Sequence, residues 1–366
     1  MAITYDAPSN TITLDGNFLN YHFDDLQAAD TAAGWGVIQT LGNSYWVNCK
    51  IVVGDGTNKT YLTDAEKNIY FTTVSGTSLH VKPNSELTLG YTDGDYGKGG
   101  CSLTALGMTG TYSFGYTSGA AGDLRLYGCS INIPCRWGWF NGTSQIVDIR
   151  NSVVRGWGLL GGTSSIIRAV FNYDVSNYYG GFGFANTFAV MEDYTCIGGG
   201  GASFFAFSYD ATIRNMKTPN QATKWIDCYG TNKTLNAVDC ESSVWGANYT
   251  GGASHTVVNR QYSYNVFVLD ETGIPIKDAR VRLIDINNTE IFNTTTNVSG
   301  QLLIGTKEVT HSQYISQAIQ TKTPHTVTVS KQAYKQYKET FTLDHKMDKT
   351  YITLKLQTPQ TDQGGI

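Results

Sequence analysis

The feature that most constrains this chain is an apolar position that recurs every 21 to 25 residues between residues 126 and 238. The positions are Leu126, Ile149, Val170, Met191, Ile213 and Val238. A small or polar residue follows each of them within three positions, namely Cys129, Asn151, Asn172, Asp193, Asn215 and Asp239. A period of this length, combined with short apolar strands, is typical of a solenoid whose repeats stack on one another.

The repeats are rich in Thr, Ile, Val, Tyr, Gly and Asn, which favour strands and turns over helices. A leucine-rich repeat is disfavoured because Leu does not recur at fixed offsets. We therefore predict an all-β fold whose larger part is a right-handed parallel β-helix. We interpret Asn151, Asn172 and Asn215 as a ladder of turn residues, since Asn tolerates the left-handed backbone conformation that a sharp turn needs.

Composition divides the chain near residue 263. Of the 40 Gly, 35 lie before this point, as do all seven Trp and all seven Cys, and charge density rises after it. We expect an N-terminal cap region at 1–43, with a short helix capped by Asp24 and ended by Gly34. The β-helix follows at 44–263, an immunoglobulin-like β-sandwich at 264–358 and a flexible tail at 359–366. The expected sandwich strands are 264–269, 279–284, 289–293, 301–304, 325–331, 337–343 and 350–356.

Several functional classes are disfavoured by composition. The net charge is −4 and no basic cluster occurs, which argues against nucleic acid as a partner. No apolar run approaches the roughly 20 residues of a membrane span, and no signal peptide is visible at the start. The cysteines form no Cys-x-x-Cys pair, so we expect small buried hydrophobic residues in a reduced chain. No cofactor is expected.

The C-terminal part carries a family resemblance. Its residues are Val268 to Ile276, Ala279 to Leu283, Thr296 with Gly300, and Val327 to Lys331 with Tyr334. This pattern resembles the carboxypeptidase regulatory-like, or transthyretin-like, β-sandwich family, although Ala333 stands where that family often has Gly. The resemblance implies a structural or adhesive module without catalysis.

The first part looks like the β-helix proteins found as virion components of tailed viruses and in archaeal surface proteins. The stretches that carry this likeness are Trp35 to Ile38, Gly54 to Thr57, Thr60 to Leu62 and Ile69 to Phe71. It implies a structural or attachment protein of a virus particle, associated with the capsid or tail and assembled in the host cytoplasm. The expected partners are copies of itself, as a homo-oligomer such as a trimer, other virion proteins and a host-surface glycan. The alternatives are a tailspike-like polysaccharide depolymerase and an extracellular adhesin of the cell surface.

If the protein is an enzyme, its catalytic carboxylates would be Glu192, Asp193, Asp239 and Glu241. Neighbouring coils lie about 4.8 Å apart, which suits the carboxyl separations of glycoside hydrolysis. The first 263 residues contain only four Glu, and no His falls between 81 and 254, so few groups titrate near neutral pH. We therefore expect no catalysis. Asp93 and Asp95 resemble the start of a calcium loop, but Thr104 occupies the position of its last ligand, so we expect a plain turn and no metal.

Aromatic residues recur on one strand line. They include Trp137, Trp139, Trp157, Tyr178, Tyr179, Phe182, Phe204 and Trp245. Residues that point inward would fill the core, and those that point outward would form a stripe larger than a monomer normally exposes. Such a stripe suits a subunit interface, and it also suits stacking on sugar rings.

Overall fold

The computed structural model describes the chain except residues 1, 17–18, 64–66, 73–78, 91–101, 106–113, 116–120, 140–144, 161–162, 174–181, 185–187, 199–204, 208, 220–225, 229, 250–255, 316–317 and 358–366. In several strands between residues 134 and 249 the description covers the backbone alone. The chain divides into two compact units. Unit 1 comprises residues 1–235 and 241–256, and unit 2 comprises residues 236–240 and 257–366.

Unit 1 begins with a hairpin, a helix and a second hairpin. Strand β1 (Ala2–Asp6) pairs antiparallel with β2 (Thr11–Asp15), and β4 (Ile38–Leu41) pairs antiparallel with β5 (Ser44–Val47). The helix α1 (Phe23–Ala33) buries Phe23 and Leu26. It ends as predicted at Gly34, whose φ of 68° is left-handed. The predicted cap at Asp24 is wrong, because the N-cap is His22, whose backbone N–H donates to the Asp25 carboxylate at 2.8 Å.

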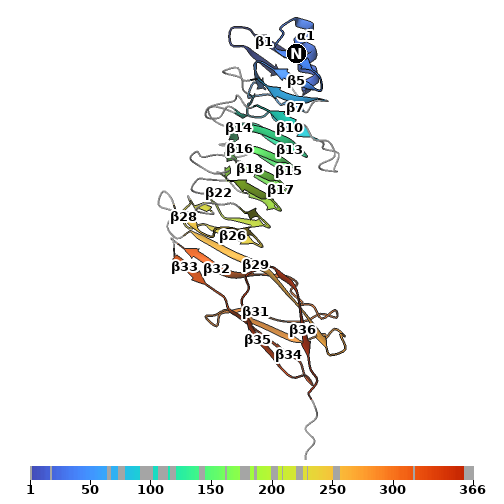
Figure 1. Cartoon of the computed structure of the whole chain (residues 1–366), viewed down its shortest axis with the longest axis vertical. Helices are drawn as coiled ribbons and strands as arrows, with labels where there is room; N and C mark the ends of the chain where they lie inside the picture. The colour runs from blue at the N-terminus through green and yellow to red at the C-terminus, as the bar shows by residue number, and fades with distance from the viewer. Residues whose placement is uncertain are drawn as a thin grey trace, which may run out of the picture. The chain divides into compact units, whose positions relative to one another are not determined.

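Parallel pairing dominates the rest of unit 1. One line of neighbouring strands consists of β3 (Leu19–His22), β7 (Thr60–Thr63), β10 (Glu86–Gly90), β13 (Asp123–Tyr127), β15 (Ile146–Arg150), β17 (Thr163–Ile167), β20 (Phe188–Glu192) and β23 (Ala211–Arg214). The strand β26 (Thr234–Val238) contains the boundary between the two units. Each pair of neighbours from β3 to β23 is parallel. Figure 1 shows β13, β15 and β17 side by side in this order.

A large mixed sheet of unit 1 contains two further lines of parallel strands. The first runs from β5 through β8 (Asn68–Phe71), β11 (Ser102–Thr104), β14 (Ser130–Trp139), β16 (Val153–Leu160), β18 (Val170–Tyr173), β21 (Thr195–Gly198) and β24 (Lys217–Thr218) to β27 (Glu241–Ser242). The second runs from β2 through β6 (Lys50–Val53), β9 (Leu79–Val81), β12 (Phe114–Gly115), β14, β16, β19 (Phe182–Phe184), β22 (Phe205–Phe207) and β25 (Ile226–Cys228) to β28 (Ala247–Tyr249). The long strands β14 and β16 belong to both lines.

The register corrects one member of the predicted repeat. Leu126 pairs with Ile149, Ile149 with Ile166, and Ile166 with Met191. Ile166 therefore occupies the position that the sequence assigned to Val170, which instead pairs with Val153 and Thr195. The error arose because this repeat is 17 residues long and the next is 25. Because the short repeat and the long repeat offset each other, the average period of the sequence does not reveal either of them.

Unit 2 consists of two sheets that share one core. In the first sheet β29 (Val257–Asp270) pairs antiparallel with β32 (Lys307–Ile315), which pairs with β33 (Ala318–Thr321), while β36 (Met347–Leu354) lies parallel to β29. The second has the order β31 (Glu290–Thr295), β30 (Arg280–Ile284), β34 (His325–Ser330) and β35 (Tyr337–Phe341), all antiparallel. The predicted alternation on β30 is confirmed, since Val281 and Leu283 are buried between exposed arginines.

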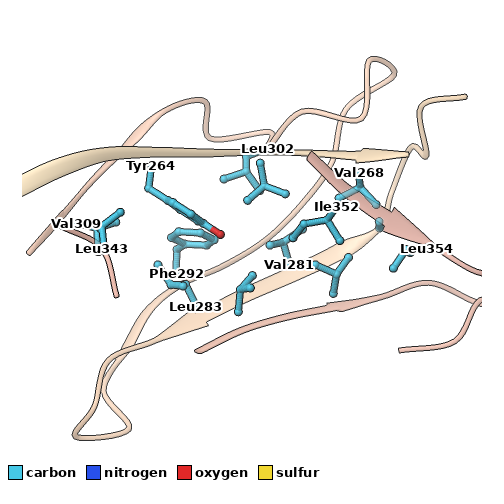
Figure 2. Packing of buried hydrophobic residues seen from close by; sticks show 14 of the residues in the cluster. Tyr264, Val268, Val281, Leu283, Phe292, Leu302, Val309, Leu343, Ile352 and Leu354 are labelled. Carbon is cyan, nitrogen blue, oxygen red and sulfur yellow. The ribbon is translucent and has the colours of Figure 1, made fainter. Parts of the chain in front are cut away.

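The core of unit 2 collects alternate residues from both sheets. Val266 and Val268 of β29 lie in one cluster with Val281 and Leu283 of β30 and with Ile352 of β36. Figure 2 shows Tyr264 reaching into this cluster beside Phe292. Burial of apolar surface from two sheet faces therefore holds unit 2 together.

The sequence missed the hairpin β32–β33 and wrongly expected a strand at 301–304, where only isolated bridges at Gln301 and Leu302 occur. The missed strand contains a bulge, because Arg260 opposes Ser312 whereas Gln261 opposes Thr310. Its buried residues Val309 and Ser312 are consequently three positions apart, which breaks the alternation that marks a strand.

The described chain is thus predominantly β with one α-helix. Within the described residues, no helix combines the length and apolarity needed to cross a membrane.

Candidate functional site

The turns after the later strands of the β3–β23 line contain a row of residues in the left-handed conformation. In unit 1 these residues, called the turn ladder below, are Gly128, Asn151, Arg168, Asp193 and Asn215, with φ between 48° and 64°. The backbone N–H of Asn151 donates to Ile167 O and that of Asp193 donates to Arg214 O, both at 3.1 Å. The backbone N–H groups of Gly128 and Arg168 donate in the same way to Arg150 O and Glu192 O, so these four turn residues are bonded to the end of the next strand in the line.

Side chains connect members of the turn ladder. Arg168 Nε donates to Asn151 Oδ1 at 2.7 Å, and Asn215 Nδ2 donates to Asp193 Oδ1 at 2.8 Å. The ladder predicted at Asn151 and Asn215 is therefore found. Asn172 does not belong to it, because it lies within β18, and Arg168 takes the left-handed position of that repeat.

The candidate carboxylates Glu192 and Asp193 lie at the end of β20 and in the turn after it. Glu192 is half-buried, and its Cα partner in β23 is Arg214. The carboxylate of Asp193 accepts the amide of Asn215, and its backbone is held in the left-handed region with φ 51°. The bond to the next turn thus gives the Asp193 carboxylate a structural role.

The other two candidates are also held by neighbours. In unit 2, Asp239 accepts the Ser263 backbone N–H at 2.7 Å and the Ser263 hydroxyl at 2.6 Å. In unit 1, Glu241 Oε1 lies 3.2 Å from Lys217 Nζ, and both side chains are more than half exposed. A bidentate turn acceptor and a surface ion pair are ordinary structural roles for these two groups.

A denser cluster of charge, missed by the sequence analysis, lies across β10, β13 and β15. We call it the charged face; its residues are Glu86, Arg125, Tyr127, Asp148 and Arg150. Arg125 Nε lies 3.2 Å from Glu86 Oε1, the Tyr127 hydroxyl donates to Asp148 Oδ2 at 2.9 Å, and Arg150 Nε donates to Asp148 Oδ1 at 2.6 Å. Asp148 is 6% exposed, so its two partners compensate a buried charge.

Burial changes the pKa values of two groups on β13, the central strand of the charged face. Burial raises the pKa of the Tyr127 phenol, and it also raises the pKa of the Asp123 carboxyl on the same strand. Asp123 nevertheless accepts the Ile146 N–H at 2.8 Å, which favours its charged form. The register could have revealed this cluster, because Arg125 is the Cα partner of Asp148 and Tyr127 that of Arg150.

The backbone places several of the predicted aromatic residues. Trp137 lies between Phe114 and Gly158, and Gly158 in turn pairs with Phe182, so these aromatics do follow one strand line. Trp139 pairs with Leu160, and Trp157 pairs with Arg136. Trp245 is half-buried just before β28. Tyr178, Tyr179 and Phe204 lie outside the described residues, and the interface role of the stripe stays a prediction.

A different aromatic pair, of an exposed and a half-buried ring, lies near the N-terminal end of the same sheet. Trp46 of β5 and Tyr70 of β8 are Cα partners whose rings stack with centroids 5.3 Å apart and planes 14° apart. Trp46 is 39% exposed, and the exposed Gln39 lies opposite it on β4. The alternation of Trp46 with the buried Tyr45 and Val47 is the sequence signal for this outward position.

The remaining predictions concern a metal site and the cysteines. Asp93 and Asp95 lie outside the described residues, and no group of three or more His, Cys, Asp or Glu that could hold a metal ion occurs in the part of the chain that the structure describes. Cys49, Cys129, Cys228 and Cys240 are buried thiols outside any disulfide, as expected of small hydrophobic residues. Burial raises the pKa of the Cys49 thiol to about 12, so this thiol is not a nucleophile at neutral pH.

Comparison with known proteins does not assign this chain to a family. No family model matches the chain, and no curated protein matches it either. One solved structure that it resembles is the Bacillus anthracis TIE protein, with 9% identity over 31% of this chain and a TM-score of 0.21. The match spans 20% of that chain's length. A likeness at this level carries no argument about function.

Proposed function

We propose that this protein is a non-enzymatic scaffold for structure and attachment, in which a right-handed parallel β-helix is followed by an immunoglobulin-like, transthyretin-like β-sandwich. Three lines of in-register parallel strands in unit 1 support the β-helix. Crossovers between parallel strands are right-handed in almost all proteins, which supports the handedness. A stack of this kind is stiff because each strand is bonded on both sides.

The non-enzymatic proposal rests on the hydrogen bonds and ion pairs that the acidic side chains form. Asp193 and Asp239 serve as turn acceptors, Glu241 forms a surface ion pair, and Asp148 is paired with Tyr127 and Arg150. Catalytic acids and bases need a pKa tuned to their task and access to substrate. These groups instead connect one strand or turn to the next.

The activity test uses a broad panel of polysaccharides with the purified full chain and with the variants Glu192→Gln, Asp193→Asn, Asp239→Asn and Glu241→Gln. The scaffold proposal expects no glycan cleavage by any of them. Cleavage by the wild type that one of these variants abolishes would overturn it in favour of a depolymerase.

The place of action remains the one implied by the resemblance, namely the surface of a virus particle, with a cell surface as the alternative. Immunogold electron microscopy with antibodies against the full chain distinguishes them. Labelling of intact particles supports a capsid- or tail-associated protein. Labelling confined to the cell envelope supports an adhesin instead.

Glycan attachment is a second candidate function, favoured by the exposed Trp46–Tyr70 stack. An aromatic ring that is 39% exposed beside a polar amide offers both apolar contact and hydrogen bonding to a sugar. A glycan array with the wild type and Trp46→Ala tests it, with Leu41→Ala as control because Leu41 is also exposed. Binding lost in Trp46→Ala and kept in Leu41→Ala supports attachment, whereas no binding by the wild type removes this candidate.

A further inference from the structure

Strand β33 of unit 2 is an edge strand whose four residues are all exposed. Among the described residues its only strand partner is β32, on one side. The large apolar side chain of Ile319 in its middle is 61% exposed. An open edge of this kind is a template for pairing with another strand.

The pattern of the β32–β33 ladder shows which backbone groups are open. Gln320 is the Cα partner of Gln313, and Lys322 N donates to His311 O at 2.8 Å just beyond the strand. Since residues of an antiparallel strand alternate in the direction of their backbone groups, those of Gln320 point toward β32, like those of Lys322. The N–H and C=O groups of Ile319 and Thr321 therefore point outward.

Charge distinguishes β33 from the other outer strands of unit 2. Strand β31 contains Glu290, β35 contains Lys338 and Glu339, and β36 contains Asp348 and Lys349. Charged residues on an edge strand suppress pairing between copies. The segment Ala318-Ile319-Gln320-Thr321 has no such protection.

A row of side-chain amides leads to the same edge. Asn259 Nδ2 donates to Asn236 Oδ1 at 2.8 Å, and Gln313 Nε2 donates to Asn259 Oδ1 at 2.9 Å. Gln320 stands next in this row as the Cα partner of Gln313. The row of amides thus ends at an exposed amide on an open strand.

We infer that β33 pairs antiparallel with β33 of a second copy of this chain, about a two-fold axis through Gln320. In this register the outward N–H and C=O groups of Ile319 lie opposite those of Thr321 in the second copy. The outward groups of Thr321 likewise lie opposite those of Ile319 in the second copy. Gln320 then faces Gln320 of the second copy at a close, non-hydrogen-bonded position, and the amide row continues across the axis. The contact also covers the exposed side chain of Ile319.

This inference does not rest on the proposed function, because an enzyme and a scaffold alike can dimerise through an edge strand. A contact of one short strand is small, so association belongs to the weak class of interfaces. We therefore expect sedimentation equilibrium of the full chain to show a monomer near 10 µM and a rising dimer fraction toward about 1 mM. A mass that stays monomeric throughout this range overturns the inference.

The two-fold axis gives a sharper test through charge. Gln320→Lys and Gln320→Glu each place like charges opposite one another, and each variant alone should dimerise about fivefold more weakly than the wild type. An equimolar mixture of the two variants should associate again, because Lys then faces Glu. Thr353→Lys is the control, since it adds the same charge to the exposed face of β36 and should leave dimerisation unchanged.

Amide exchange followed by NMR locates the contact. The amides of Ile319 and Thr321 should gain protection as concentration rises, whereas that of Gln320, already bonded to β32, should not change. Dimerisation that persists in both single-charge variants, or a mixture that fails to associate, would assign self-association to another surface. Either result overturns the β33 contact and leaves the scaffold proposal standing.

Discussion

The side-chain amide of Asn215 donates to the carboxylate of Asp193 at 2.8 Å, and both residues have a left-handed backbone, with φ of 53° and 51°. The bond joins two successive turns of unit 1. Sequence position alone would offer Asp193 as a catalytic acid. Its partner shows that the carboxylate is an acceptor in a repeating structural element, which is why we assign the turn ladder to stability.

The first prediction follows from this bond. Asn215→Asp keeps a residue that tolerates the left-handed region but replaces the donor with a second carboxylate, so it should destabilise unit 1 by about 1 kcal/mol at pH 7. The loss should shrink near pH 3, where carboxylates protonate. Urea unfolding of the variant at both pH values measures it. Asn215→Gly, which fits the backbone and adds no charge, serves as control and should show no such recovery in acid.

Close packing between strands gives the second prediction. Gly90 has φ of 86°, and a Cβ on it would lie 1.7 Å from the carbonyl oxygen of Tyr127. Because that atom belongs to the backbone of the paired strand, Gly90→Ala should cost about 4 kcal/mol or more. Gly56 has φ of 95° but no atom within 4 Å of such a Cβ, so Gly56→Ala should cost only about 1 kcal/mol of backbone strain. Thermal unfolding of the two variants should therefore differ widely, and equal losses would contradict the tight strand packing at Gly90.

The outcome at particular residues shows how far sequence reasoning reaches. The β class, the strands around Trp46, Ile51, Ile69, Leu79 and Leu87, and the helix end at Gly34 follow from local alternation and turn chemistry. Arg168 in a left-handed turn has no such signal, because long side chains seldom adopt φ above zero. Only the register with its neighbours identifies it.

The candidate site was harder to foresee for a related reason. The charged face joins Glu86, Arg125 and Asp148, which are far apart in the sequence and meet only because β10, β13 and β15 are paired. A repeat of varying length hides these pairings. The carboxylates that the sequence did single out follow apolar positions, and for Asp193 and Asp239 this placement marks a left-handed turn.

The third prediction concerns acid. His325 is fully buried in unit 2, and burial lowers the pKa of its imidazole to about 4, although the Asp285 carboxylate partly opposes this. In the unfolded chain the pKa is near 6.5, so below that pH the unfolded state binds a proton that the folded state does not. The contribution of neutral His325 is therefore full above about pH 6.5 and is lost as pH falls toward 4, by up to about 3 kcal/mol.

Urea unfolding of unit 2, followed between pH 7 and pH 4, measures this dependence. His325→Leu removes this group and should make the loss of stability over this range smaller, with the part due to His311, whose pKa burial also lowers, remaining. His345→Gln is the control, because its side chain is 71% exposed, and it should keep the wild-type slope. A slope in His325→Leu that equals that of the wild type would assign the acid sensitivity to other groups.

The fourth prediction separates the ring of Tyr264 from its hydroxyl. Tyr264 is 1% exposed and lies in the core of unit 2 (Figure 2). Its ring stacks on Phe341 with centroids 5.3 Å apart, and its hydroxyl is buried without a hydrogen-bond partner in the described structure. Burial without a partner costs about 1 to 3 kcal/mol, so Tyr264→Phe should leave unit 2 equally stable or make it more stable. Tyr264→Ala removes the ring and should cost about 3 to 5 kcal/mol. Chemical denaturation of both variants measures the two terms, and a Tyr264→Phe variant that is clearly less stable than the wild type would show that the hydroxyl is bonded.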